Sequence, residues 1–114
     1  MALLIKNIKH SKIYELADIV EYEKGKVASM TLSQNPGVGV TLFAIDQGEG
    51  LNTHSAPGDA MAYILDGQVE IIIDNEKYVL EAGQMIVMPE GLPHSLKALR
   101  PFKMMLVLVK KPKV

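Results

Sequence analysis

Residues 48–67 read GEGLNTHSAPGDAMAYILDG and combine one histidine, His54, with bordering glycines and a run of small and apolar residues. A shorter stretch, residues 83–94, reads GQMIVMPEGLPH and runs from a glycine through an apolar segment and Pro89 to a second histidine, His94. Glycine permits backbone angles that other residues resist, so these glycines mark chain reversals. Proline lacks a backbone donor and therefore suits the end of a strand. Together the stretches predict two imidazoles, on facing strands, that point into one cavity.

Short segments rich in Val, Ile, Thr and other apolar residues recur along the chain from residue 27 onward. Turn-forming sequences separate them, among them residues 33–37, Asp66-Gly67 and Asp74-Asn75. Regular spacing of short strands indicates an all-β sandwich or barrel, and we expect two facing antiparallel sheets. The expected strands cover residues 27–32, 38–45, 61–65, 69–73, 77–80, 85–88, 95–99 and 102–109.

The first 25 residues follow a different pattern. Ile13, Leu16, Ala17 and Val20 recur at helical spacing for about two turns, and the pattern stops at Gly25. A helix this short is marginal alone and must dock on a sheet. We therefore expect residues 1–25 to form a short helix or arm beside the barrel.

Length and charge narrow the classes of function. The chain has 114 residues, which is one domain, 1–114, with a single core. Its formal net charge is −1, so no strong field attracts nucleic acid or an anionic membrane, and neither is expected as a partner. The absence of cysteine excludes disulfides and thiolate metal sites. The N-terminal apolar run is too short for a signal peptide core, so we expect the cytoplasm.

The two histidine stretches resemble the two motifs of the cupins. The first motif, G-x5-H-x-H-x3-4-E-x6-G, matches at Gly48, His54 and Gly67. The second, G-x5-P-x-G-x2-H-x3-N, matches at its glycines, its proline and its histidine: Gly83, Pro89, Gly91 and His94. The resemblance covers residues 38–109 and implies a double-stranded β-helix, the RmlC-like jelly-roll barrel. The chain is further similar to small bacterial cupins of unassigned function.

Cupins in general hold a metal with two histidines and a glutamate from the first motif and one histidine from the second. Here the second histidine position is Ala56, the glutamate position is Ala60, and the final asparagine position is Ala98. The resemblance therefore implies a degenerate site in which only His54 and His94 remain as ligands. A divalent transition metal (Zn, Fe, Ni, Mn or Cu) is then expected at low affinity, because two of four ligands are missing.

Three functions remain open from these residues. The first is a small-molecule pocket inside the barrel, formed by the two histidines and three alanines: His54, Ala56, Ala60, Ala62 and His94. The second is a metal-dependent cupin enzyme of the dioxygenase or isomerase type, with an incomplete protein ligand set. The third is metal-free acid/base chemistry by His54 with Asp59, as in the epimerases that share the cupin fold.

Consecutive apolar residues in three expected strands, 71–73, 86–88 and 104–109, predict burial on both faces of each strand. One face fills the barrel, and something must cover the other. The N-terminal segment is one candidate. A homodimer in which sheet faces of two copies meet is the other, and it is the interpretation we favour, because large exposed apolar patches usually mark interfaces.

Overall fold

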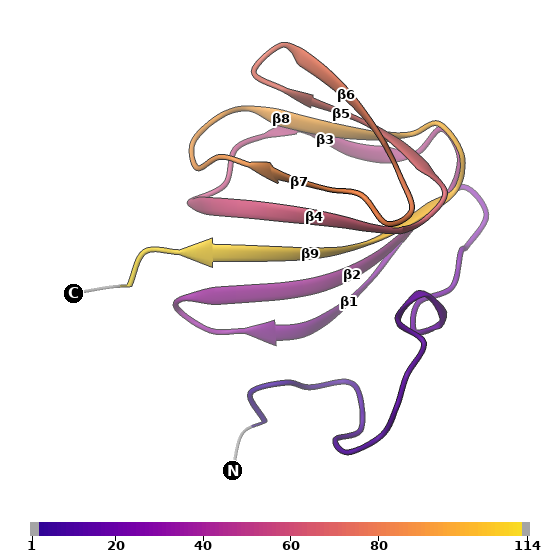
Figure 1. Cartoon of the computed structure of the whole chain (residues 1–114), viewed down its shortest axis with the longest axis vertical. Helices are drawn as coiled ribbons and strands as arrows, with labels where there is room; N and C mark the ends of the chain where they lie inside the picture. Colours follow the sequence, from indigo (N-terminus) through magenta and orange to yellow (C-terminus); the bar gives the residue numbers. More distant parts are fainter. Residues whose placement is uncertain (1–2, 113–114) are drawn as a thin grey trace.

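The computed structural model describes residues 3–112, which form nine strands and one short 3-10 helix. One sheet has five strands, in the order β1 (Val27–Gln34), β2 (Val38–Ile45), β9 (Phe102–Lys110), β4 (Gly58–Asp66) and β7 (Met85–Met88). The other has four, in the order β3 (Gly50–His54), β8 (His94–Ala98), β5 (Gln68–Ile73) and β6 (Glu76–Glu81). Figure 1 shows the sheets as two layers, and neighbouring strands pair antiparallel. The predicted all-β jelly-roll barrel is confirmed.

The ends of the predicted domain lie outside this description. Residues 1–2 belong to the predicted arm and residues 113–114 to the predicted C-terminus, and the structure does not describe them. Across residues 3–112, no helix has the length and apolar character that crossing a bilayer requires.

All eight predicted strands are present, with small shifts at their ends, and the structure adds β3. Strand alternation does not reveal β3, because the side chains of Asn52, Thr53 and His54 are all exposed. It forms by pairing with β8, and its register is interrupted by a bulge or similar irregularity between Leu51 and His54. The strand that carries the first histidine is thus specified by its neighbour rather than by its own residues.

The interior between the sheets is filled by alternate residues of the strands. On β5, Val69, Ile71 and Ile73 are buried, whereas Glu70 between them turns to the outer side. The buried cluster consists of Ile45, Ala60, Ala62, Ile64, Val69, Ile71, Ile73, Leu80, Met88, Leu96, Ala98, Phe102 and Met104.

Gly67 connects the two sheets. The tight turn predicted at Asp66-Gly67 is a corner rather than a hairpin, because β4 lies in the five-stranded sheet and β5 in the four-stranded one. Gly67 has a φ of +78°, and a Cβ there would lie 1.8 Å from the carbonyl oxygen of Pro101. Only glycine combines this backbone angle with this close approach.

The N-terminal segment is an arm and not a two-turn helix. Only Leu16–Asp18 is helical, as a single 3-10 turn, and Ile13 is 95% exposed. No side chain caps the turn, and so short a helix cannot persist without tertiary support. Tertiary contacts hold the arm instead. Lys103 donates from Nζ to the carbonyl oxygen of Ala17 at 2.6 Å, and the Tyr22 hydroxyl donates to Asp66 at 2.6 Å.

The arm covers one part of the outer face of the five-stranded sheet. Leu42 and Ala44 are buried, at 1% and 0% exposure, although neither belongs to the interior cluster. Lys103, which the arm contacts, is the β9 residue opposite Ala44. Figure 1 shows the arm beside β1 at that edge of the molecule. The N-terminal segment therefore accounts for part of the two-sided burial predicted for these strands.

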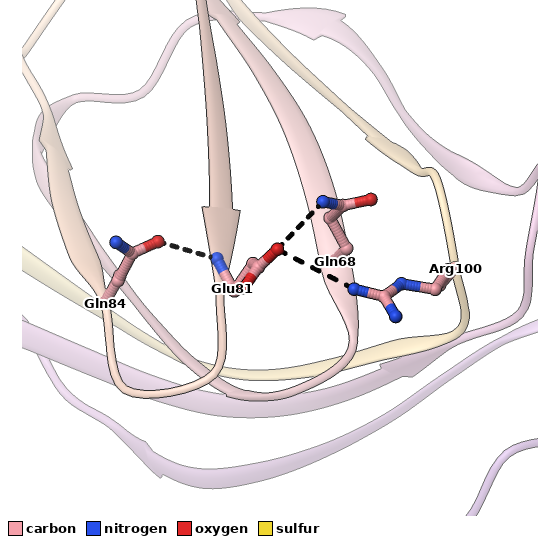
Figure 2. Close-up of polar contacts among 4 residues, drawn as sticks. All are labelled: Gln68, Glu81, Gln84 and Arg100. Atoms are coloured by element: carbon pink, nitrogen blue, oxygen red, sulfur yellow. Dashed lines mark hydrogen bonds and ion pairs between the residues drawn. The ribbon is translucent and has the colours of Figure 1, made fainter.

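Glu81 connects three turns at one end of the barrel (Figure 2). Its Oε1 accepts a hydrogen bond from Gln68 Nε2 at 3.1 Å and lies 3.7 Å from a guanidinium nitrogen of Arg100. Its backbone N–H donates to Gln84 Oε1 at 2.8 Å. The Glu81 and Arg100 side chains are about 60% exposed, so their ion pair contributes little to stability. The cluster orders the end of the barrel where β5 begins and β6 ends.

Replacing Gly67 with Ala should destabilise the fold much more than replacing Gly83. Both glycines have positive φ, +78° and +90°, but no atom lies within 4 Å of the Cβ position at Gly83. Gly83→Ala should cost roughly 1–2 kcal/mol of unfolding free energy for its backbone conformation alone. Gly67→Ala adds a collision with the Pro101 backbone and should cost at least about 1 kcal/mol more. Urea unfolding of both variants measures the difference in unfolding free energy. Equal losses of stability would contradict the requirement for glycine at the Gly67 corner.

Candidate functional site

The two predicted histidines meet at one end of the barrel. His54 is the last residue of β3, His94 is the first residue of β8, and the register of the two strands places them directly opposite each other. Their Nε2 atoms are 3.2 Å apart. The strands are neighbours in one sheet, not facing strands of two sheets, which corrects the prediction about how the rings approach. A cross-strand pair brings them together.

Each imidazole is oriented by a backbone carbonyl. His54 Nδ1 lies 2.7 Å from the carbonyl oxygen of Asn52, and His94 Nδ1 lies 3.2 Å from that of Leu92. A carbonyl oxygen only accepts, so each Nδ1 carries the hydrogen and donates it. The two Nε2 lone pairs then face each other. A proton, a hydrogen-bond donor or a cation placed between them can interact with both lone pairs.

The Nε2 separation fits two neighbouring positions of a tetrahedral metal site. Two nitrogens 2.0–2.1 Å from such a metal lie about 3.3 Å apart, close to the 3.2 Å found here. The ring centroids are 4.4 Å apart with an interplanar angle of 71°, so the rings converge at an angle. Within residues 3–112, however, no group of three His, Cys, Asp or Glu side chains could hold a metal ion. The protein offers a metal two nitrogen ligands.

The alanines at the other motif positions are part of the barrel wall. Ala60 and Ala62 are 2% and 0% exposed, lie on the inner side of β4, and belong to the buried cluster with Ala98. Ala56 is half-buried in the preceding loop, where its carbonyl oxygen accepts from Gly91 N–H at 3.1 Å. Methyl groups thus stand where the family's ligands would stand, and they pack into the core.

Asp59 does not assist the histidines. It lies within β4 next to Ala60, so alternation turns it to the opposite face from that buried residue. Its Oδ1 accepts from Glu90 N–H at 2.9 Å. The carboxylate therefore orders the loop before His94 and has a partner away from His54. Acid/base chemistry by His54 with Asp59 has no support in this geometry.

A hollow of about 240 Å³ lies on the inner face of β1, β2 and β9, and pattern reading did not find it. Lys110, at the end of β9, pairs with Gly58, which follows His54 closely in the chain. This hollow therefore lies at the barrel end that carries His54 and His94, although neither histidine lines it. Strand alternation could have predicted part of its lining, because residues 106, 108 and 110 share the inner face of β9. Its lining residues are Thr31, Gln34, Gly39, Thr41, Leu106, Leu108 and Lys110.

A larger hollow, of about 500 Å³, lies elsewhere. Its lining includes Glu70, Ser95 and Lys97, which occupy the outer face of the four-stranded sheet. Neither histidine lines it. The end of the barrel where the imidazoles converge is therefore the candidate functional site.

Burial and the neighbouring His54 lower the pKa of His94 from its ordinary value. His94 is 2% exposed, and loss of hydration penalises its charged form. In the unfolded chain the group regains its ordinary pKa, near 6.5. Between the lowered and the ordinary pKa, the unfolded state binds more protons than the folded state. The free energy of unfolding is then fully retained above pH 6.5 and falls as the pH drops.

In chelator-treated protein, this His94 contribution should reach at most about 1.4 kcal/mol per pH unit below pH 6.5. Urea unfolding from pH 7.5 to 5 should lose less stability in His94→Gln than in the unchanged protein, because the variant no longer titrates there. Parallel stability curves for the two proteins would contradict the assignment.

Comparison with known proteins agrees with the fold and the motifs. The cupin domain family matches residues 41–109. The crystal structure of a conserved protein of unknown function from Streptococcus pyogenes is 45% identical, with a TM-score of 0.95 over 98% of both chains. A cupin superfamily protein from Desulfitobacterium hafniense is 27% identical, with a TM-score of 0.89 over 94% of this chain and 98% of the other. No curated protein matches the chain.

An enzyme shares the fold at lower identity. The structure of a salicylate 1,2-dioxygenase variant from Pseudoaminobacter salicylatoxidans is 20% identical, with a TM-score of 0.68 over 73% of this chain and 26% of the other, and shows likeness of fold alone. The family match spans more than half of the 114 residues. This chain belongs to the cupin family.

Proposed function

We propose that this cupin binds a small organic molecule at the open end of its barrel, with His54 and His94 as directional hydrogen-bonding groups. The convergence of the two Nε2 atoms, 3.2 Å apart, carries the proposal. Small-molecule sites are concave, mostly apolar and contain a few well-placed polar groups. An oxygen or N–H group of a ligand that approaches the pair meets two oriented nitrogens.

Ala60 and Ala62 lie in the core behind this proposed pocket. Ala60 and Ala62 pair across strands with Leu108 and Leu106, which line the hollow at the same end. Ala56 stands in the loop at its rim. Where the family places a glutamate and a second histidine, methyl groups leave an apolar surface. Such a surface suits the carbon skeleton of a ligand and not a tightly held cation.

The second candidate is a metal-dependent cupin enzyme with an incomplete ligand set, favoured by the match between the Nε2 separation and a tetrahedral edge. His54 and His94 would hold the ion, and substrate or water would occupy its other positions. Such an ion would act as a Lewis acid toward a bound oxygen. The loss of two protein ligands makes its affinity low.

We further propose a homodimer through the uncovered part of the five-stranded sheet. On its outer face the register forms a continuous apolar row across four strands: Val40, Val107, Met61 and Val87. Val87 is 43% exposed, and Val109 beside the row is 57% exposed. A flat row of uncharged side chains is self-complementary under a two-fold axis. A second copy that covers it removes this apolar surface from water.

We keep the cytoplasm as the proposed location. The chain has no cysteine and so carries no sign of an oxidising compartment.

Purified, untreated protein should contain clearly less than one metal ion per chain by elemental analysis, and chelator should leave its melting temperature unchanged. A neutral fragment library screened by ligand-detected NMR should yield binders, and His54→Gln should abolish their binding. His10→Gln, on the exposed arm, is the matched control and should retain it. Full metal occupancy that is lost in His54→Gln would instead favour the enzyme.

Val87→Lys should weaken the dimer at least tenfold, because a charge would be buried against apolar side chains. Val79→Lys is a matched control, since Val79 is 53% exposed and lies on an edge strand of the other sheet. Sedimentation equilibrium over a range of concentrations measures both dissociation constants. A monomeric unchanged protein, or equal effects of the two variants, would rule out this interface.

A further inference from the structure

We propose that the open end of the barrel binds a small carboxylate, with its negative charge at Lys110 and its apolar part against Leu106 and Leu108. This inference rests on the proposed ligand-binding function. It adds the chemical class of the ligand and the wall of the site that lies on the sheet opposite the histidine strands.

The hollow has the size and composition for such a ligand. Its volume of about 240 Å³ corresponds to roughly eight water molecules, which suits a compound of about ten non-hydrogen atoms. Leu106 and Leu108 supply apolar surface, and Thr31 and Thr41 supply hydroxyl groups beside it. Neither aspartate nor glutamate lines the hollow. Its one formal charge is the ammonium group of Lys110.

Lys110 is a partly buried cation without an acidic partner among the described residues. Alternation along β9 places it on the inner face with Leu106 and Leu108. The two ion pairs within residues 3–112 are Arg100 with Glu81 and Lys111 with Glu90, so no carboxylate described lies within 4 Å of Lys110. A cation beside apolar side chains interacts more strongly with an anion than it does in bulk water. An anion in the hollow would supply one.

The nearest acids have other partners. Lys110 also borders a shallow hollow of about 230 Å³ that Asp59 and Glu90 line. Asp59 Oδ1 accepts from the Glu90 backbone N–H at 2.9 Å, and Glu90 Oε1 lies 3.5 Å from Lys111 Nζ. Lys111 therefore takes the acid on the outer side of the strand. Lys110 keeps an uncompensated positive charge on the inner side.

Neutral donors complete the recognition of one carboxylate. The side chains of Thr31, Gln34 and Thr41 line the hollow and make no side-chain hydrogen bond to another described residue. One ammonium group with hydroxyl and amide donors matches a single negative charge on two oxygens. A phosphate dianion would call for more cations or a cradle of backbone N–H groups. The geometry thus favours a monocarboxylate with a short apolar body.

The test uses matched pairs of charged and neutral compounds on the chelator-treated full chain. Benzoate and hexanoate are compared with benzamide and hexanamide by isothermal titration calorimetry, with methyl shifts of Leu106 and Leu108 as the reporter of position. We expect the carboxylates to bind at least tenfold more tightly than the amides. Inorganic phosphate should not displace benzoate.

Three variants test whether Lys110 supplies the positive charge that binds the carboxylate. Lys110→Gln should weaken benzoate binding at least tenfold and leave benzamide binding unchanged. Lys111→Gln carries the same loss of charge one residue away and should bind benzoate as the unchanged protein does. Lys110→Arg should retain the preference for the carboxylate. Melting temperatures verify that each variant is folded.

The outcomes separate this inference from the function on which it rests. Amides that bind as tightly as the acids, or a Lys110→Gln variant with unchanged benzoate affinity, would overturn the carboxylate. If binding of the acids and amides were still lost in His54→Gln, the proposal of a small-molecule site would be retained. Displacement of benzoate by phosphate would overturn the assigned class. If no compound of either charge shifts the leucine methyl groups, the inference at Lys110 falls, and the fragment screen with His54→Gln decides the proposed function separately.

Discussion

The crossing of the chain from one sheet to the other at Gly67 is the constraint on which the site depends. Because a single residue makes the corner, β5 must begin at Gln68. The pairing of β5 with β8 then runs from Val69 opposite Ala98 to Ile73 opposite His94. The pairing of β8 with β3 places His54 opposite His94 in turn. A side chain at the corner would collide with the Pro101 backbone, so the crossing and the register that follows from it both require glycine.

The imidazole pair keeps a defined geometry without an acidic side chain from residues 3–112 between the two histidines. Alanine at positions 60, 62 and 98 extends the hydrophobic core up to the open end of the barrel. The histidines keep their place because backbone carbonyls and strand pairing orient them, and neither support needs a metal or the lost glutamate. What remains is a pair of oriented nitrogens at the same end of the barrel as a hollow that Leu106, Leu108 and Lys110 line. We propose that these groups serve recognition of a small molecule rather than tight metal binding.

The outer face of the five-stranded sheet reconciles two explanations for the doubly apolar strands. The arm buries Leu42 and Ala44, where Lys103 and Asp66 provide polar anchors for it. Farther along the same strands, no such anchor among residues 3–112 reaches the row that ends at Val87, and Val87 is exposed. Apolar residues on both faces of a strand therefore predict that both faces are buried. They do not say whether the same chain or another copy supplies it.

The residues alone determined the all-β barrel, eight of the nine strands and the two histidines, because strand composition, glycine turns and motif spacing are local properties of the chain. The tertiary structure decided the rest. β3 has no alternation of its own and exists through pairing with β8, the corner at Gly67 depends on the distant backbone of Pro101, and the arm is extended because Lys103 and Asp66 hold it. The hollow at Lys110 is lined by residues from three strands. Asp59 accepts a hydrogen bond from the backbone N–H of Glu90 and does not contact His54. Each of these depends on contacts between residues far apart in the sequence, which no local pattern encodes.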